Sequence, residues 1–131
     1  MRTRALLATV AVAEALAGCG LLVVPSIIAR LLIGQPLSDG AGSIVGRVAG
    51  AAMVSLALAC WLESRSTRLH RPAGLLTGLL FYNIAVPLVL LHGHFVQGAN
   101  GGGLWAATGV HLALAAWIAA CLFARPAAHT L

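Results

Sequence analysis

The feature that most constrains this chain is a set of four long apolar runs, at residues 5–24, 43–62, 73–92 and 103–124. Each has about the 20 residues of helix that are needed to cross ~30 Å of bilayer hydrocarbon. Backbone groups in lipid must hydrogen-bond to one another, and long runs without alternation of polar and apolar residues exclude a β-barrel. We therefore predict an all-α, polytopic membrane protein built as a bundle of four transmembrane helices.

The composition leaves little material for a water-exposed surface. The 131 residues are 60% hydrophobic and 8% charged, and the mean hydropathy is +0.97. An ordinary soluble domain carries roughly three times that share of charged residues, about 25%. The chain shows no linker and no shift in composition, so we expect residues 1–131 to form a single four-helix membrane domain.

The arginines predict an orientation. Six of them fall on one side of the predicted bundle: Arg2, Arg4, Arg65, Arg68, Arg71 and Arg125. Loops rich in arginine stay in the cytoplasm, so we predict that both termini and the loop after the second span face the cytoplasm. This topology accounts for the net charge of +5. We expect the lipid bilayer as a partner, and no nucleic acid.

The two outer segments differ in character. Residues 25–34, PSIIARLLIG, predict a short interfacial helix, with Arg30 able to extend towards the headgroups. The apolar residues that we expect on one side of it are Ile27, Ile28, Leu31 and Leu32. The second outer segment, at 93–102, is rich in glycine and predicts a flexible loop.

Residues 16–19 read LAGC, which has the form of a lipoprotein cleavage box. Two features favour an uncleaved first span. Glu14 interrupts the apolar run that would serve as a signal, and the residues after Cys19, GLLVVPSII, stay apolar where a lipoprotein would begin a polar tether. We therefore expect Glu14 to be a carboxylate inside the membrane.

Every predicted span carries a polar side chain: Glu14, Arg47, Tyr82 with Asn83, and His111. A rise of ~1.5 Å per residue puts Glu14 and Asn83 at ~14–15 Å from the cytoplasmic edge, and His111 and Arg47 at ~20–22 Å. We expect these side chains to face the bundle interior and to share one layer. Glu14 could carry a proton or bind a cation there. Alternatively, Glu14, Arg47 and His111 only neutralise and hydrogen-bond one another, and so fix the register of the helices.

Glycines recur every four residues in the second span, as Gly42, Gly46 and Gly50, and again in the third, as Gly74 and Gly78. This spacing leaves one helix face without side chains and allows close contact with another helix. The contact can lie within the bundle, or it can join the chain to another membrane subunit or to a second copy. The spacing alone leaves both possibilities open.

The histidines support weaker hypotheses. His92 and His94 are candidate metal ligands at the outer end of the third span, although two ligands without a third are a weak signal. A four-helix bundle can hold haem between two histidines, but His111 lies ~10 Å from the level of these two. The sequence contains no nucleophile–base pair, phosphate-binding loop or metalloprotease motif, so we expect neither enzymatic activity nor a cofactor.

The segments AEALAG, PSIIARLLIG, GRVAGA, YNIAV and GVHLAL together resemble uncharacterised small four-span membrane proteins of bacteria. This resemblance covers most of the chain. It implies a location in the bacterial inner membrane and no activity. The chain is also similar in length and number of spans to the small multidrug resistance family. Proteins of that family have a glutamate in the first span, and Glu14 has the corresponding place in this sequence. Tyr82, Asn83 and Pro87 in the third span do not match that family. The leading hypothesis is a non-catalytic accessory or assembly subunit. The alternatives are a small proton-coupled transporter that uses Glu14 and a haem- or metal-binding subunit.

Overall fold

The computed structural model describes residues 2–37, 40–67 and 72–123, and this part of the chain is helical apart from short connections. Its elements are α1 (Arg2–Val23), α2 (Pro25–Ile33), α3 (Gly40–Ser64), α4 (Ala73–Gln97) and α5 (Leu104–Phe123). Helices α1, α3, α4 and α5 are each long and apolar enough to cross a membrane. The predicted all-α bundle of four spans, with a short helix after the first, is confirmed. Of the arginines used for the orientation, Arg68, Arg71 and Arg125 lie outside the described residues.

The largest difference from the predicted boundaries is at the end of α4. This helix continues to Gln97, where the sequence predicted an end at residue 92. Gly98 then takes a φ of 73°, a left-handed conformation that glycine adopts without steric cost and that commonly ends helices. His92 and His94 therefore lie within the last turns of a helix.

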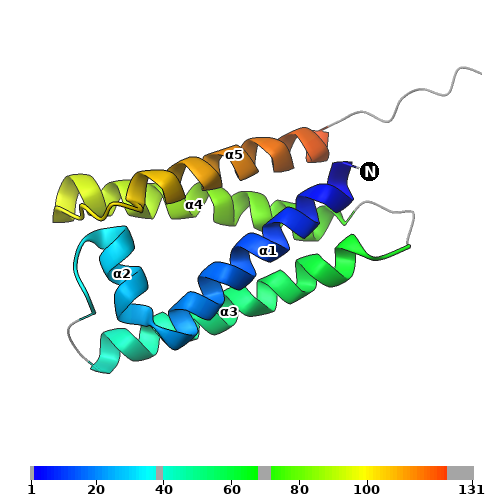
Figure 1. Cartoon of the computed structure of the whole chain (residues 1–131). Coiled ribbons are helices and arrows are strands. Elements are labelled where there is room, and N and C mark those ends of the chain that lie inside the picture. The colour runs from blue at the N-terminus through cyan, green and yellow to red at the C-terminus, as the bar shows by residue number, and fades with distance from the viewer. Residues whose placement is uncertain (1, 38–39, 68–71, 124–131) are drawn as a thin grey trace, which may run out of the picture.

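The four long helices form two antiparallel pairs, α1 with α3 and α4 with α5 (Figure 1). The pairs converge at the end of the molecule where α1 begins, and they separate at the other end, where α2 lies between them (Figure 1). Helix α2 contacts all four long helices. The bundle is therefore wedge-shaped, with its narrow end on the predicted cytoplasmic side.

Large apolar side chains fill the narrow end. They come from α1, α4 and α5 and include the buried residues Leu6, Leu7, Val10, Leu76, Leu79, Leu114 and Ile118. Cys60 and Cys121 belong to the same core, where a free thiol packs as a small apolar group. We refer to this set as the leucine core.

The pair α1–α3 is held by backbone contact at two glycines. A Cβ atom on Gly18 would lie 2.8 Å from the carbonyl oxygen of Gly50, and one on Gly50 would lie 2.7 Å from that of Gly18. Both distances are too short for real atoms, so only glycine permits this crossing. Gly46 packs in turn against Pro25 at the start of α2. The glycine face of α3 thus makes contacts within the chain.

Helix α2 begins with Pro25, whose missing amide hydrogen costs nothing in the first turn, and it ends at Gly34 with a φ of 85°. The predicted apolar face is only half correct. Ile28 and Leu32 turn towards the protein together with Pro25 and Ala29, whereas Ile27 and Leu31 are exposed. The helix is rotated because its small residues pack against the neighbouring helices.

The glycine-rich connection between α4 and α5 is docked on α2. The amide of Gly103 donates a hydrogen bond of 2.8 Å to the carbonyl of Leu31, and the amide of Asn100 donates one of 3.1 Å to that of Ile33. A Cβ atom on Gly101 would collide with the backbone of Leu31 and Leu32. We expected these glycines to provide flexibility; instead they allow two backbones to touch.

Candidate intramembrane polar site

Glu14 lies on the inward face of α1, one turn beyond Val10 of the leucine core, and is only 2% exposed. Its carboxylate accepts a hydrogen bond of 3.2 Å from the hydroxyl of Tyr82 on α4. Within the part of the chain that the structure describes, no arginine or histidine forms an ion pair with it. A buried carboxylate is therefore held by one neutral hydrogen bond.

His111 and Asn83 form a second polar contact, between α5 and α4. The fully buried Asn83 donates a hydrogen bond of 2.9 Å from Nδ2 to the carbonyl of Leu79, which turns its Oδ1 towards His111. Nδ1 of His111 lies 2.9 Å from this oxygen. Because an amide oxygen only accepts, Nδ1 carries the hydrogen.

The two contacts join into one cluster through an aromatic contact. The rings of Tyr82 and His111 meet edge to face, with centroids 5.6 Å apart and planes at 80°. We call Glu14, Tyr82, Asn83 and His111 the Glu14 cluster. It draws on three helices and links the α1–α3 pair to the α4–α5 pair.

Arg47 does not join this cluster, contrary to the prediction. Its side chain is exposed and donates to the carbonyl of Leu22, near the C-terminal end of α1. Carbonyls in the last turn of a helix lack partners in the helix and carry its partial negative charge, so a guanidinium is well placed there. Arg47 points away from the Glu14 cluster, and a depth counted along the helix does not give this direction.

Thr108 is a polar residue for which the sequence reasoning assigned no role. It is 5% exposed, lies one turn before His111 on the inward face of α5, and its Oγ1 has no hydrogen-bond partner among the residues that the structure describes. Its spacing of three residues from His111 was the signal that could have identified it, because residues three apart share a helix face. An unpaired hydroxyl in an apolar bundle costs free energy, about 1–3 kcal/mol.

The two outer histidines have separate surroundings. Nδ1 of His94 lies 2.7 Å from the carbonyl of Ala99, and its ring meets that of Trp105 edge to face at 5.2 Å. These contacts hold the end of α4 against the start of α5, while His92 is exposed. Among the described residues, no three His, Cys, Asp or Glu side chains gather as a metal site would require.

The five predicted packing glycines also have different surroundings. Gly50 and Gly46 make the internal contacts given above, and Gly42 is half-buried near the start of α3. Around Gly74 and Gly78 of α4, by contrast, a Cβ atom would meet no atom of the described residues within 4 Å. The glycine face of α4 is therefore open.

The position of the Glu14 cluster limits what it can do. On one side lies the leucine core, one helical turn away along α1, α4 and α5. On the other side α2 packs between the helix pairs, with Ile28 against Gly20 of α1. The cluster thus combines a buried carboxylate with a half-buried phenol and a half-buried imidazole in an apolar setting. Such a set can hold a proton or a cation and pass hydrogen bonds between its members.

Comparisons with protein-family models, with curated proteins and with solved structures find no match to this chain.

Proposed function

We propose that this protein is a small membrane carrier that couples transport to the binding and release of a proton at Glu14. The observation that supports the proposal is a carboxylate that is 2% exposed and has a single neutral hydrogen bond, from Tyr82, and no charged partner among the described residues. An uncompensated carboxylate ion is costly in this setting. The group therefore needs either a proton or a cation from outside the chain.

The proposed exchange balances charge. When Glu14 is protonated, its carboxyl group is neutral and stable in the bundle. When it releases the proton, a cationic solute takes the place of the proton beside the carboxylate, and the Tyr82 and His111 rings offer aromatic surface to it. The arginine distribution and the apolar spans support a bacterial inner membrane as the place of action, with both termini in the cytoplasm.

The test measures this exchange directly. Tetraphenylphosphonium, a hydrophobic cation, is added to the purified protein in weakly buffered detergent, and proton release is followed with a pH indicator. We expect release in proportion to the amount of protein, and we expect Glu14→Gln to abolish it. Glu63→Gln is the matched control, because Glu63 lies at the end of α3 and outside the cluster. Folded native protein that releases no protons would contradict the proposal.

A second readout separates protonation from binding of the probe. A hydrophobic carbodiimide attacks protonated carboxyl groups in apolar surroundings and adds mass to the peptide that contains them. We expect mass on the peptide with Glu14, and less of it when tetraphenylphosphonium is present. Labelling that the probe does not reduce would mean that Glu14 holds a proton but does not exchange it for this cation.

The second candidate is a non-catalytic accessory or assembly subunit, and the open glycine face of α4 favours it. Gly74 and Gly78 have nothing within 4 Å of a built Cβ atom, so the helix of another subunit could approach closely there. We expect Gly78→Leu to remove a partner that copurifies in mild detergent. Gly109→Leu is the control on α5, where the surroundings are equally open. Equal recovery of the partner with both variants would count against this candidate.

A further inference from the structure

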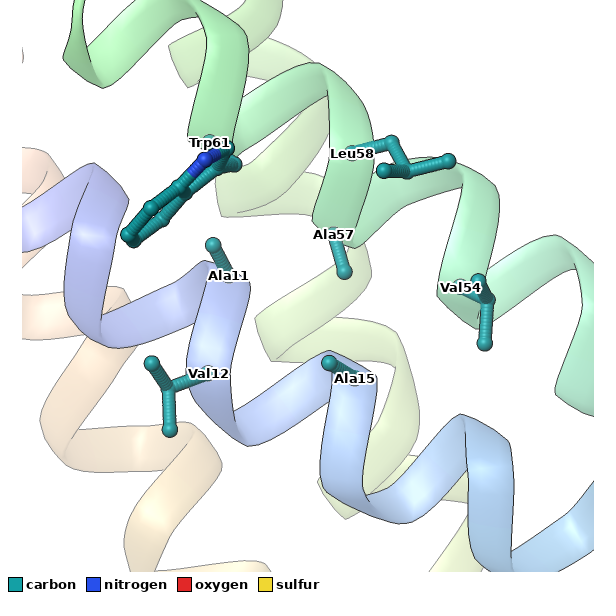
Figure 2. Close-up of a pocket in the computed structure, with 7 residues that line it drawn as sticks. All are labelled: Ala11, Val12, Ala15, Val54, Ala57, Leu58 and Trp61. Carbon is teal, nitrogen blue, oxygen red and sulfur yellow. The ribbon is translucent and has the colours of Figure 1, made fainter.

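A groove on the surface of the α1–α3 pair belongs neither to the Glu14 cluster nor to the glycine crossing. Its volume is 210 Å³, and it is lined by Ala11, Val12, Ala15, Val54, Ala57, Leu58 and Trp61 (Figure 2). We call it the α1–α3 groove. The lining is free of charged side chains, so its occupant must be apolar.

The groove exists because alanines lie where the two helices face each other. Ala57 of α3 and Ala15 of α1 lie between the helices, and Trp61 reaches from α3 towards Ala11 and closes one end (Figure 2). Ala11 and Ala57 are buried and form the floor, whereas Val12 and Leu58 are exposed at the rim. Because the rim residues are exposed, the groove is open to the lipid that would surround the helices.

The groove and the end of α3 together span one leaflet of a bilayer. A helical rise of ~1.5 Å per residue gives ~10 Å for the groove, from Val54 to Trp61, and ~15 Å from Val54 to Ser64, where α3 ends beside Arg65. Half of the ~30 Å hydrocarbon core is ~15 Å. An acyl chain that begins beside Arg65 would therefore reach the end of the groove near the middle of the membrane.

Positive charge lies at the end closed by Trp61. The guanidinium carbon of Arg65 lies 4.4 Å from the centre of the Trp61 ring. From α1, the guanidinium of Arg4 donates a hydrogen bond of 2.9 Å to the carbonyl of Ser66, the residue after Arg65. Both arginines are exposed, and neither forms an ion pair with a described residue. Tryptophan and arginine in this arrangement are typical of the headgroup level of a membrane.

We propose that the α1–α3 groove binds an anionic phospholipid, with one acyl chain against Ala11, Ala15 and Ala57 and the phosphate beside Arg65 and Arg4. The apolar groove accounts for the chain, and the unpaired guanidinium groups account for the negative headgroup. Arg65 already stacks on Trp61, so its fork of donors is held at the Trp61 end of the groove. The site is independent of the function proposed for Glu14.

The test uses Trp61 as a reporter in the full chain. The protein contains three tryptophans, so replacing Trp105 and Trp117 by phenylalanine leaves Trp61 alone. This variant is placed in nanodiscs of ordinary phosphatidylcholine. Increasing fractions of one brominated lipid are added, either phosphatidylglycerol or phosphatidylcholine with brominated acyl chains, and quenching of the Trp61 fluorescence is measured. We expect brominated phosphatidylglycerol to quench at a lower mole fraction than brominated phosphatidylcholine.

Two substitutions test the two halves of the site. Arg65→Gln should reduce the preference for phosphatidylglycerol by about fivefold, the worth of one basic residue near an anionic surface. Ala15→Leu fills the groove and should weaken quenching by both lipids. Arg30→Gln is the matched control, because Arg30 is an exposed arginine on α2, at the other end of α1.

Three outcomes would overturn the proposal. Equal quenching by the two lipids would show that the arginines select no headgroup. If Arg65→Gln and Arg30→Gln reduced the preference for phosphatidylglycerol equally, that preference would come from the net charge of the protein and not from this site. Weak quenching by both lipids, together with cross-linking of Val12→Cys to a second copy, would show that the groove holds another chain.

Discussion

The two helix pairs of this bundle are held together by different means. In the α1–α3 pair, Gly18 and Gly50 bring two backbones into contact, and the exposed Arg47 of α3 donates to the carbonyl of Leu22 beside this crossing. In the α4–α5 pair, the glycines at 74, 78 and 109 are open, and a buried hydrogen bond joins His111 to Asn83. Both are known ways to join helices in lipid, where apolar surface alone gives no preference for protein over lipid.

This difference shows that the same glycine spacing does not have a fixed use. Gly46 and Gly50 in α3 meet Pro25 and Gly18, so their face is used within the chain, whereas Gly74 and Gly78 in α4 meet nothing. The spacing determines how closely a helix can be approached. Which helix packs there depends on the sequence of the other helix. In α1 the matching residue is Gly18, which belongs to no repeated glycine pattern, so the spacing in α3 could not identify it.

The largest effect is expected from adding one methyl group at the α1–α3 crossing. Gly50→Ala would place a Cβ atom 2.7 Å from a backbone oxygen of α1, so the helices must move apart. We expect a loss of about 2–3 kcal/mol in the free energy of unfolding, the range for overpacking a tight contact. The measurement is unfolding by increasing SDS in mixed micelles.

Gly78→Ala is the matched control for that experiment. A Cβ atom there meets nothing, so the change should lie within about 0.5 kcal/mol, and the better helix propensity of alanine favours a small gain. Equal losses in the two variants would mean that the close contact with α1 does not cause the first result, because only Gly50 has that contact.

The next effect tests the polar contact of the α4–α5 pair. Asn83→Leu removes the acceptor of His111 and leaves its Nδ1 hydrogen unpaired in the bundle. We expect a loss of about 1–2 kcal/mol in the same unfolding assay. The double variant Asn83→Leu/His111→Leu should recover part of this loss, because both polar groups are then absent. Additive losses would contradict a direct contact.

A smaller effect is expected where the two pairs meet. Tyr82→Phe removes the hydroxyl that donates to Glu14, and we expect a loss of about 0.6–1.7 kcal/mol, as measured for hydrogen bonds between membrane helices. In Glu14→Gln the hydroxyl keeps an acceptor, so the loss there should be smaller. A larger loss in Glu14→Gln than in Tyr82→Phe would indicate that a charge on Glu14 matters for stability.

The smallest effect is expected at Thr108, and it has the opposite sign. Its hydroxyl has no partner, so Thr108→Val keeps the shape and removes a buried polar group. We expect unchanged stability or a gain of up to about 1 kcal/mol. A clear loss would show that the hydroxyl has a partner in the membrane, such as water or a bound solute, and would make Thr108 a member of the site.

Parts of the polar site followed from the sequence and parts did not. Glu14, Tyr82, Asn83 and His111 were predicted to gather because a polar group in an apolar span avoids lipid, and the structure places them together. Arg47 was grouped with them by depth alone. Depth follows from residue counting, but direction around the helix depends on which neighbour it packs against, and α3 turns Arg47 towards the end of α1.

The class of the molecule was determined by the sequence itself. Four apolar runs of membrane length permit little besides a helical bundle, because backbone groups in lipid must bond locally. The pairing of the helices, the position of α2 between them and the separation of Arg47 from Glu14 were decided only by the tertiary structure. These features depend on contacts such as Gly18 with Gly50 and Gly101 with Leu31, which join residues far apart in the chain. Local periodicity carries no information about such contacts, because it describes one helix at a time.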